Sequence, residues 1–131
     1  MVRSDPPLIL IVDDEKSYRL ALRAQLRRCG YRTVTAVDGE EALVIARDTS
    51  PDAILLDLAM PDVDGNRFLW QLRRDESLRE TPVIVLTALT HTDAIDQAER
   101  LGVRHVLLKS KFSLADLAAR LAELLPGRDA A

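Results

Sequence analysis

The chain has 131 residues, of which 47% are hydrophobic, and its 18 basic and 21 acidic residues give a formal net charge of −3. This length suits one domain with a buried core. The apolar runs are short and no basic segment precedes a long apolar one, so we expect neither a membrane span nor a signal peptide. Dispersed charge argues against direct nucleic-acid binding. The single cysteine, Cys29, cannot form an internal disulfide and favours a cytoplasmic location.

Short runs rich in Val, Ile and Leu predict five β-strands. In chain order they are LILIV (8–12), RTVTA (32–36), AILLD (53–57), VIVLT (83–87) and HVLLK (105–109). The intervening segments space their apolar residues as one face of a helix does, which predicts five helices. The third is expected over about 66–75 and the fourth over about 92–101.

Four residues predict where helices begin or end. Asp38 and Ser113 carry side chains that accept hydrogen bonds from helix N-terminal amides, so they are the expected N-caps of the second and fifth helices. Gly30 and Gly102 stand where the first and fourth helices should end. These signals agree with the apolar periodicity.

The order of elements predicts an α/β fold. Strands that alternate strictly with helices, and that are apolar throughout, favour a parallel sheet covered on both faces, which is a three-layer sandwich. We expect the strand order 2-1-3-4-5. We assign 8–125 to this domain, 1–7 to an N-terminal extension and 126–131 to a C-terminal tail that is too short to be an output domain. Such sheets bind ligands beyond the carboxyl ends of their strands.

Polar residues end four of the five predicted strands. Asp13 and Asp14 follow the first, Asp57 ends the third, Thr87 the fourth and Lys109 the fifth. The second strand ends without a reactive side chain. In the order 2-1-3-4-5, the four strands that end in these polar residues are contiguous. We therefore expect their side chains to share one small ligand.

These residue types favour phosphoryl chemistry. Crowded carboxylates raise the pKa of at least one of them unless a cation compensates, and Mg²⁺ suits an all-oxygen site. Mg²⁺ and Lys109 together would balance the three carboxylates. Thr87 and Lys109 could then contact phosphoryl oxygens, and Asp57 could be the nucleophile that forms an aspartyl phosphate.

Four motifs in order carry a family resemblance: VDDE (12–15), DLAMPDVDG (57–65), LTA (86–88) and the Lys109 that follows an apolar strand. The chain resembles the receiver domain of two-component response regulators, and is similar to the single-domain chemotaxis regulator. The resemblance covers about 8–125. It implies a flavodoxin-like fold, an Mg²⁺ requirement that Mn²⁺ could also meet, and phosphoryl transfer from a histidine kinase or a histidine phosphotransfer protein.

The resemblance also implies residue roles. Asp57 is the phospho-acceptor and, with Asp14, a direct metal ligand; Asp13 acts mainly through water, and the backbone carbonyl of Ala59 completes the ligation. Lys109 contacts the phosphoryl group. After modification, Thr87 shifts toward that group.

The implied function is a signalling switch and not a turnover enzyme on external substrates. It would catalyse its own phosphorylation and dephosphorylation and change the binding of an unknown effector protein through the face formed by the fourth helix, fifth strand and fifth helix. A small Mg²⁺-dependent phosphatase that acts on external substrates is a further alternative, because it would use similar aspartyl chemistry. However, the sequence contains no cap region that would recognise such a substrate.

Two departures from the family pattern keep another reading open. Ser110 follows Lys109 where the family usually has proline, and Val106 stands where it usually has an aromatic residue. The alternative function is therefore a degenerate receiver that binds partners without phosphorylation. Lys111 could also be mistaken for the working lysine, although the count from Gly102 favours Lys109.

Two further features have both a structural and a functional interpretation. Arg19, Arg23 and Arg27 form a stripe on the first helix, which is either a solvated face or part of a docking surface for the phosphodonor. Trp70 lies between predicted core positions, and packing at the core edge is favoured over a contact surface.

Overall fold

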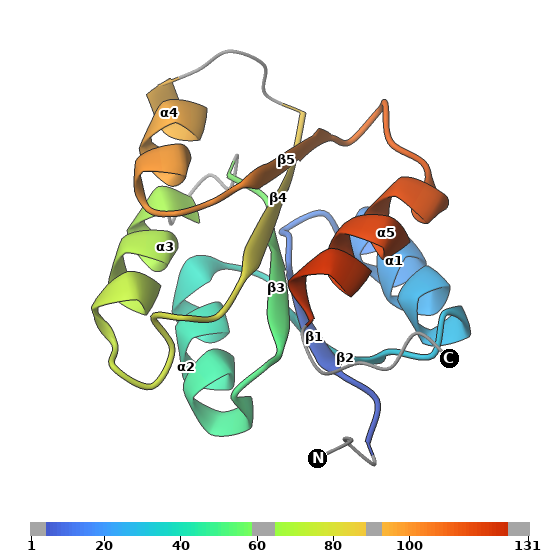
Figure 1. Cartoon of the computed structure of the whole chain (residues 1–131), viewed down its shortest axis with the longest axis horizontal. Coiled ribbons are helices and arrows are strands. Elements are labelled where there is room, and N and C mark those ends of the chain that lie inside the picture. The colour runs from blue at the N-terminus through green and yellow to red at the C-terminus, as the bar shows by residue number, and fades with distance from the viewer. Residues whose placement is uncertain (1–4, 59–64, 89–92, 126–131) are drawn as a thin grey trace.

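The computed structural model describes residues 5–58, 65–88 and 93–125, in which strands and helices alternate as predicted (Figure 1). The elements are β1 (Leu8–Val12), α1 (Lys16–Arg28), β2 (Arg32–Ala36), α2 (Gly39–Thr49), β3 (Ala53–Leu56), α3 (Gly65–Arg74), β4 (Val83–Thr87), α4 (Asp93–Arg100), β5 (His105–Leu108) and α5 (Leu114–Leu124). The predicted boundaries differ by about a residue. In particular, Asp57 and Lys109 lie just beyond β3 and β5, so their backbones belong to the connections that follow these strands.

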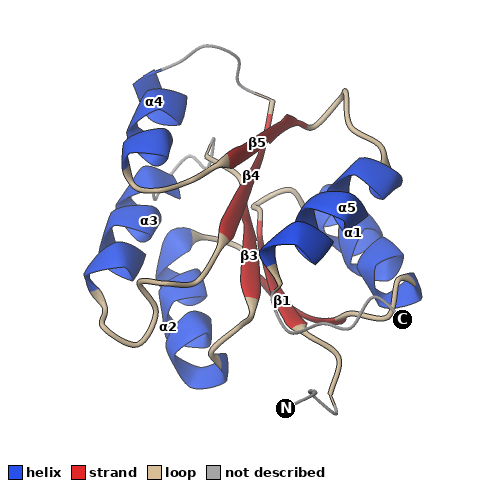
Figure 2. Cartoon of the chain, viewed as in Figure 1, coloured by secondary structure: helices blue, strands red, loops and turns tan. Residues whose placement is uncertain are grey.

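The strands form one parallel sheet in the order β2-β1-β3-β4-β5, which confirms the predicted topology (Figure 2). In the register of β1 with β3, Val12 lies opposite Leu56. The next residues along the two strands, Asp13 and Asp57, therefore leave the sheet at the same level. All carboxyl ends meet at one edge, which places the polar residues of four strands together.

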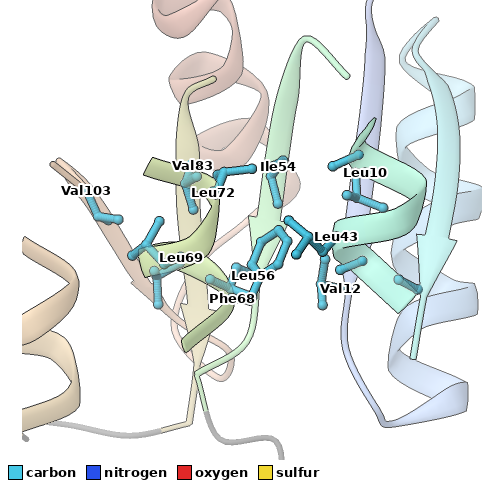
Figure 3. Packing of buried hydrophobic residues seen from close by; sticks show 14 of the residues in the cluster. Leu10, Val12, Leu43, Ile54, Leu56, Phe68, Leu69, Leu72, Val83 and Val103 are labelled. Atoms are coloured by element: carbon cyan, nitrogen blue, oxygen red, sulfur yellow. The ribbon is translucent and has the colours of Figure 1, made fainter. Parts of the chain in front are cut away.

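Helices cover both faces of the sheet and complete the predicted three-layer sandwich. The α2, α3 and α4 helices lie on one face, and α1 and α5 lie on the other (Figure 1). Alternate strand residues serve the two cores: Leu10 and Val12 of β1 face the first, whereas Ile9 and Ile11 face the second. Figure 3 shows the first core, where Phe68 of α3 packs against the sheet without exposure to solvent. Burial on both faces holds the strand ends in fixed positions.

The predicted helix ends are confirmed at four positions. The Asp38 carboxylate accepts a 2.8 Å hydrogen bond from the Glu41 amide, and Ser113 forms a capping box at the start of α5. Gly30 and Gly102 adopt φ angles of 92° and 91°, which cost glycine little and which other residues adopt rarely.

The turn into α1 is fixed by a residue that precedes the N-cap position. Glu15 occupies the N-cap position without a side-chain cap bond, and the Asp13 carboxylate accepts a 2.9 Å hydrogen bond from the Glu15 amide. One carboxylate therefore fixes the turn into α1 and also faces the rim of the sheet.

Within these described ranges, no helix is both long enough and apolar enough to cross a membrane.

Candidate functional site

Three carboxylates meet at the carboxyl edge of the sheet. Asp13, Asp14 and Asp57 each offer one carboxylate oxygen, and these oxygens lie within 4.8 Å of one another. Asp13 and Asp57 are buried, with 2% and 5% of their surface exposed, whereas Asp14 is exposed. The sequence-based expectation that strand ends separated in the chain form one acidic cluster is confirmed.

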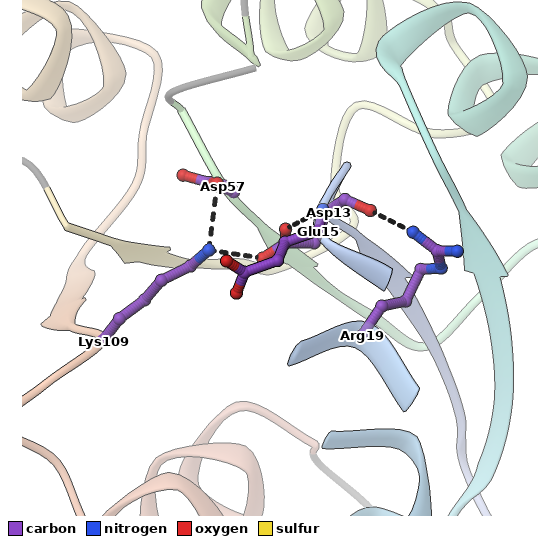
Figure 4. A network of polar contacts seen from close by, with 5 residues as sticks. All are labelled: Asp13, Glu15, Arg19, Asp57 and Lys109. Carbon is purple, nitrogen blue, oxygen red and sulfur yellow. Dashed lines mark hydrogen bonds and ion pairs between the residues drawn. The ribbon is translucent and has the colours of Figure 1, made fainter. Parts of the chain in front are cut away.

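The Lys109 ammonium lies between two of these acids. Its Nζ is 2.7 Å from Asp13 Oδ2 and 3.1 Å from Asp57 Oδ2 (Figure 4). The same Nζ lies 4.4 Å from the centre of the Tyr18 ring, within the range of a cation–π contact. An ammonium thus stands between β1 and β3 although it comes from the end of β5. Among the positions that the structure describes, Lys109 is the lysine that contacts the acids. The sequence favoured Lys109 over Lys111 for this contact.

Burial dominates the ionisation of this cluster. It raises the pKa of Asp13, against the opposing effects of the Lys109 hydrogen bond and the Glu15 amide, and the charge of Asp57 raises it further. Burial lowers the pKa of Lys109, but its hydrogen bonds and charge interactions with Asp13 and Asp57 outweigh this effect, so its pKa is raised. The sequence predicted a raised carboxylate pKa from crowding. The direction is confirmed, whereas the larger cause is burial.

Backbone contacts between β4 and the following strand hold Lys109 in place. Thr87, the last residue of β4, is fully buried, and its carbonyl oxygen accepts a 3.0 Å hydrogen bond from the Lys109 amide. The Lys111 amide donates a 3.0 Å bond to the Leu108 carbonyl. No cis peptide occurs in the described chain, so the bond between Lys109 and Ser110 is trans. These contacts put Thr87 and Lys109 on adjacent strand ends, as predicted.

A close backbone approach fixes the exit from β3. A Cβ atom added to Gly65 would lie 2.8 Å from the Asp57 carbonyl oxygen and 2.9 Å from Leu58 Cα. Only glycine lets α3 start so near the Asp57 backbone. Asn66, the next residue, donates a 2.8 Å hydrogen bond from Nδ2 to the Ala94 carbonyl, and so joins α3 to α4 beside the site. Ala59, whose carbonyl was predicted as a metal ligand, lies outside the described residues.

Val106, one of the two departures from the family pattern, and its neighbour His105 have clear positions. Val106 packs against the core on the α4 side of the sheet, at the position where the family usually has an aromatic residue. His105 faces the other side, and its Nδ1 lies 2.9 Å from the Arg120 guanidinium of α5. These neighbours thus point to opposite faces of the sheet, as successive residues of a strand do.

The arginine stripe of α1 has structural contacts that the sequence did not reveal. Arg19 donates a 2.9 Å hydrogen bond to the Asp13 carbonyl oxygen, so it supports the backbone of the site (Figure 4). Arg27 donates a 3.1 Å bond to the Thr33 hydroxyl of β2.

Trp70 was predicted to pack at the edge of the core. Half of its surface is exposed, and the centre of its ring lies 4.6 Å from the Arg74 guanidinium carbon. Trp70 therefore packs at the core edge with only part of its side chain.

The donor set suits a hard divalent cation. Carboxylate oxygens are the ligands that Mg²⁺ prefers, and it usually binds through one or two carboxylates while it keeps several waters. The exposed Asp14 leaves one side of the cluster accessible to such a hydrated ion. In addition, the buried Asp13 and Asp57 carry charges that Lys109 alone cannot neutralise.

Comparison with known proteins identifies the family. A family model described as the response regulator receiver domain matches residues 9–122, and the chain belongs to this family. A relative, the transcriptional regulatory protein PrrA of Mycobacterium leprae, is 40% identical over 124 residues, which is 95% of this chain and 52% of the relative. The chain spans about half the length of the curated relatives it matches. Receiver domains are signalling modules.

Solved structures agree in fold, and one of them contains a magnesium ion. The chemotaxis protein CheY4 of Vibrio cholerae has a TM-score of 0.84 at 31% identity, over 92% of this chain and 99% of that one. The receiver domain of a Pseudomonas aeruginosa sensor histidine kinase, with a magnesium ion in its active-site cleft, has a TM-score of 0.83 at 31% identity, over 92% and 98%. The flavodoxin-like fold predicted from sequence is confirmed.

Proposed function

We propose that this chain is a phosphorylation-activated switch that accepts a phosphoryl group on Asp57 from a histidine kinase or a histidine phosphotransfer protein. The observation that carries the proposal is the arrangement around Asp57. Its carboxylate is 5% exposed, lies within 4.8 Å of the oxygens of two further acids and contacts the Lys109 ammonium. A merely structural aspartate at a strand end needs neither two neighbouring carboxylates nor a shared ammonium.

Asp57 is the nucleophile in this proposal. One carboxylate oxygen attacks the phosphorus of a phosphohistidine, and the new P–O bond forms as the P–N bond breaks. The imidazole leaves with the bonding electrons and takes up a proton. The rigid end of β3 and the close contact of Gly65 with the Asp57 backbone hold the attacking oxygen in one direction.

Asp14 and Asp57 would hold Mg²⁺ directly, with Asp13 acting through water and the Ala59 carbonyl as a further ligand; Mn²⁺ is a proposed substitute. When bound, the ion supplies positive charge that neutralises phosphoryl oxygens. Asp13 also holds the Lys109 ammonium 2.7 Å away and fixes the turn into α1 through the Glu15 amide. The acidic cluster supports this assignment.

Lys109 and Thr87 would recognise the transferred group. Lys109 contacts Asp57 Oδ2 at 3.1 Å, so its ammonium is within reach of an oxygen attached there. Thr87 is the last residue of the neighbouring strand β4, and we propose that its hydroxyl shifts toward the phosphoryl group. The resulting change would reach the surface of α4, β5 and α5, where an effector protein binds. Val106 excludes an aromatic rotamer switch at that position, so backbone movement or other side chains have to carry the signal.

The proposal also covers where the reaction takes place and what the protein acts on. The reaction belongs in the cytoplasm, and the lone cysteine, Cys29, supports a reducing compartment. The protein acts on itself and not on external phosphomonoesters.

Intact-mass measurement after incubation with Mg²⁺ and acetyl phosphate or phosphoramidate tests the proposal. We expect a gain of one phosphate, lost in Asp57→Asn and kept in Asp48→Asn, an exposed control with the same charge change. No gain with either donor would favour the phosphorylation-independent interaction module. Multiple turnover of added phosphomonoesters would instead favour a phosphatase. Phosphotransfer from a panel of histidine kinases would then identify the donor.

A further inference from the structure

A second concentration of charge lies at the opposite edge of the sheet, near the amino ends of β4 and β5. An open pocket of about 570 Å³ lies between the end of α3, the segment before β4, the end of α4 and the start of β5. Four arginines line it, Arg73, Arg79, Arg100 and Arg104, together with one carboxylate, Glu80. The positive charge of this surface contrasts with the net charge of −3 of the whole chain.

One of the four guanidiniums is fixed by backbone oxygens. Arg73 Nε donates a 2.8 Å hydrogen bond to the Leu101 carbonyl, and Nη1 donates bonds of 3.0 and 2.7 Å to the carbonyls of Arg79 and Thr81. These partners are neutral dipoles, so they orient the guanidinium without cancelling its charge. Arg73 thereby joins three walls of the pocket and holds a positive charge in its lining.

The positive charge of the pocket is compensated only in part, by the charge of Glu80, which raises the pKa of Arg73 against the larger, opposite effect of burial. Among residues 5–58, 65–88 and 93–125, none of the four guanidiniums lies within ion-pair distance of a carboxylate. The four positive charges of the arginines and the one negative charge of Glu80 sum to a formal charge of +3. Like charges from four separate segments repel one another, and a multiply charged anion would relieve this repulsion.

We propose that this pocket binds the polyphosphate group of a small molecule such as a nucleoside triphosphate. Guanidiniums recognise phosphate oxygens through paired hydrogen bonds, and a polyphosphate carries enough negative charge to match the pocket, whereas a single carboxylate does not. The volume falls in the ordinary range for small-molecule sites. The apolar residues Val83, Leu101 and Leu124 also line the pocket and suit the non-phosphate part of a ligand.

A neighbouring pocket strengthens the case for a nucleotide. It has a volume of about 490 Å³, contains the exposed Trp70, and shares Arg100 and Leu101 with the basic pocket. An aromatic base next to Trp70 and phosphates among the arginines would occupy two adjoining pockets. The proposed site is independent of Asp57 chemistry, because it lies at the other end of the strands.

Calorimetric titration with tripolyphosphate and with ATP in Mg²⁺-free buffer tests the proposal. We expect saturable binding of one ligand per chain, weakened about tenfold or more in Arg100→Gln/Arg104→Gln, since each charged hydrogen bond is worth more than a tenfold change in affinity. Arg23→Gln/Arg28→Gln removes the same charge from α1 and should bind within about twofold of the unaltered protein.

Two outcomes would overturn the proposal: no saturable binding of either probe, or equal weakening in both double variants. Amide chemical-shift mapping gives a result that does not depend on the folding of variants. ATP should perturb Gly102 and Arg104 more than Asp14, and the reverse would place the ligand at the acidic cluster. Tighter binding of ATP than of tripolyphosphate, reduced by Trp70→Leu, would extend the site into the neighbouring pocket, and equal binding would confine it to the phosphate chain.

Discussion

The Lys109 ammonium lies 2.7 Å from the Asp13 carboxylate and 3.1 Å from that of Asp57, so one cation is shared by two buried acids. The side chain of Lys109 is 17% exposed, and those of the acids are 4% and 6% exposed. Water therefore screens these charges weakly, and the removal of one partner leaves the others without compensation.

Lys109→Met should therefore lower both stability and phosphorylation. We expect the free energy of unfolding of the Mg²⁺-free protein to fall by about 3 kcal/mol at neutral pH, because two buried carboxylates lose their counter-charge. The phosphorylation rate with acetyl phosphate should fall by about tenfold or more. Urea unfolding and time-resolved intact mass measure the two effects. Lys111→Met is the matched control, since Lys111 is exposed; equal effects in both variants would contradict the assignment of Lys109.

Tyr18 should position Lys109 through its ring and not through its hydroxyl. Because the ring centre lies 4.4 Å from Lys109 Nζ, Tyr18→Phe keeps the contact and Tyr18→Leu removes it. We expect the leucine variant to lose about 1 kcal/mol of stability and to be phosphorylated more slowly, while the phenylalanine variant resembles the unaltered protein. The same two assays apply. If phenylalanine and leucine were equally impaired, the hydroxyl would be the working group.

Much of the fold and the acidic site could be predicted because both follow from patterns along the chain. Strands that are apolar throughout imply burial on both faces, and a parallel sheet gathers its carboxyl ends at one edge, so Asp13, Asp57 and Lys109 had to converge. Asp38 and Ser113 cap helices through bonds within their own turns, which the local sequence specifies.

What could not be predicted depends on side-chain directions and on distant backbone. Tyr18 has the spacing of a core residue, and nothing in that spacing shows that its ring meets Lys109. Arg73 donates hydrogen bonds to the backbone carbonyls of Leu101, Arg79 and Thr81. Every residue has such a carbonyl, so residue types do not show which ones Arg73 contacts. The basic pocket was missed for the same reason, since dispersed arginines become neighbours only after folding.

Asp14 should be needed for metal binding but not for folding. It is the exposed member of the acidic cluster, so Asp14→Asn should change the stability of the Mg²⁺-free protein by less than about 0.5 kcal/mol. Excess Mg²⁺ should stabilise the unaltered protein by about 2.7 kcal/mol at a hundred times its dissociation constant, and the variant much less. Thermal unfolding with and without Mg²⁺ measures this difference. The exposed Glu15→Gln serves as control, and a Mg²⁺ response retained in Asp14→Asn would contradict the proposed ligation.

The raised pKa of Asp13 should make stability without Mg²⁺ depend on pH. Because its folded-state pKa lies above 3.8, Asp13 contributes stability that is fully present below pH 3.8 and is lost as pH rises through the folded pKa. The pKa of Lys109 is also raised, so its contribution is fully present below pH 10.5 and stays constant in this window.

Unfolding free energies of the unaltered protein and of Asp13→Asn, measured from about pH 4 to about pH 8 in EDTA, isolate the contribution of Asp13. The stability of the unaltered protein relative to the variant should fall across the acidic part of the range and then level off. A relative stability that rises with pH would show that ion pairing outweighs burial at this carboxylate.

Gly65→Ala should disturb the site through the backbone of Asp57. The added methyl group would lie 2.8 Å from the Asp57 carbonyl oxygen and 2.9 Å from Leu58 Cα, and backbone atoms cannot move aside as a flexible side chain can. We expect a loss of about 1–3 kcal/mol in stability, the usual cost of overpacking, and slower phosphorylation because the carboxylate of Asp57 is re-aimed.

Gly102→Ala is the matched control for this change. Gly102 has a φ of +91°, so alanine there is strained as well, but the nearest atom to its Cβ is Arg73 Nε at 3.8 Å, far from the acidic cluster. It should lose about 1 kcal/mol of stability and keep its phosphorylation rate. Urea unfolding and intact-mass kinetics on both variants separate the two effects. Equal phosphorylation rates in Gly65→Ala and Gly102→Ala would show that the close approach to Asp57 matters for stability alone.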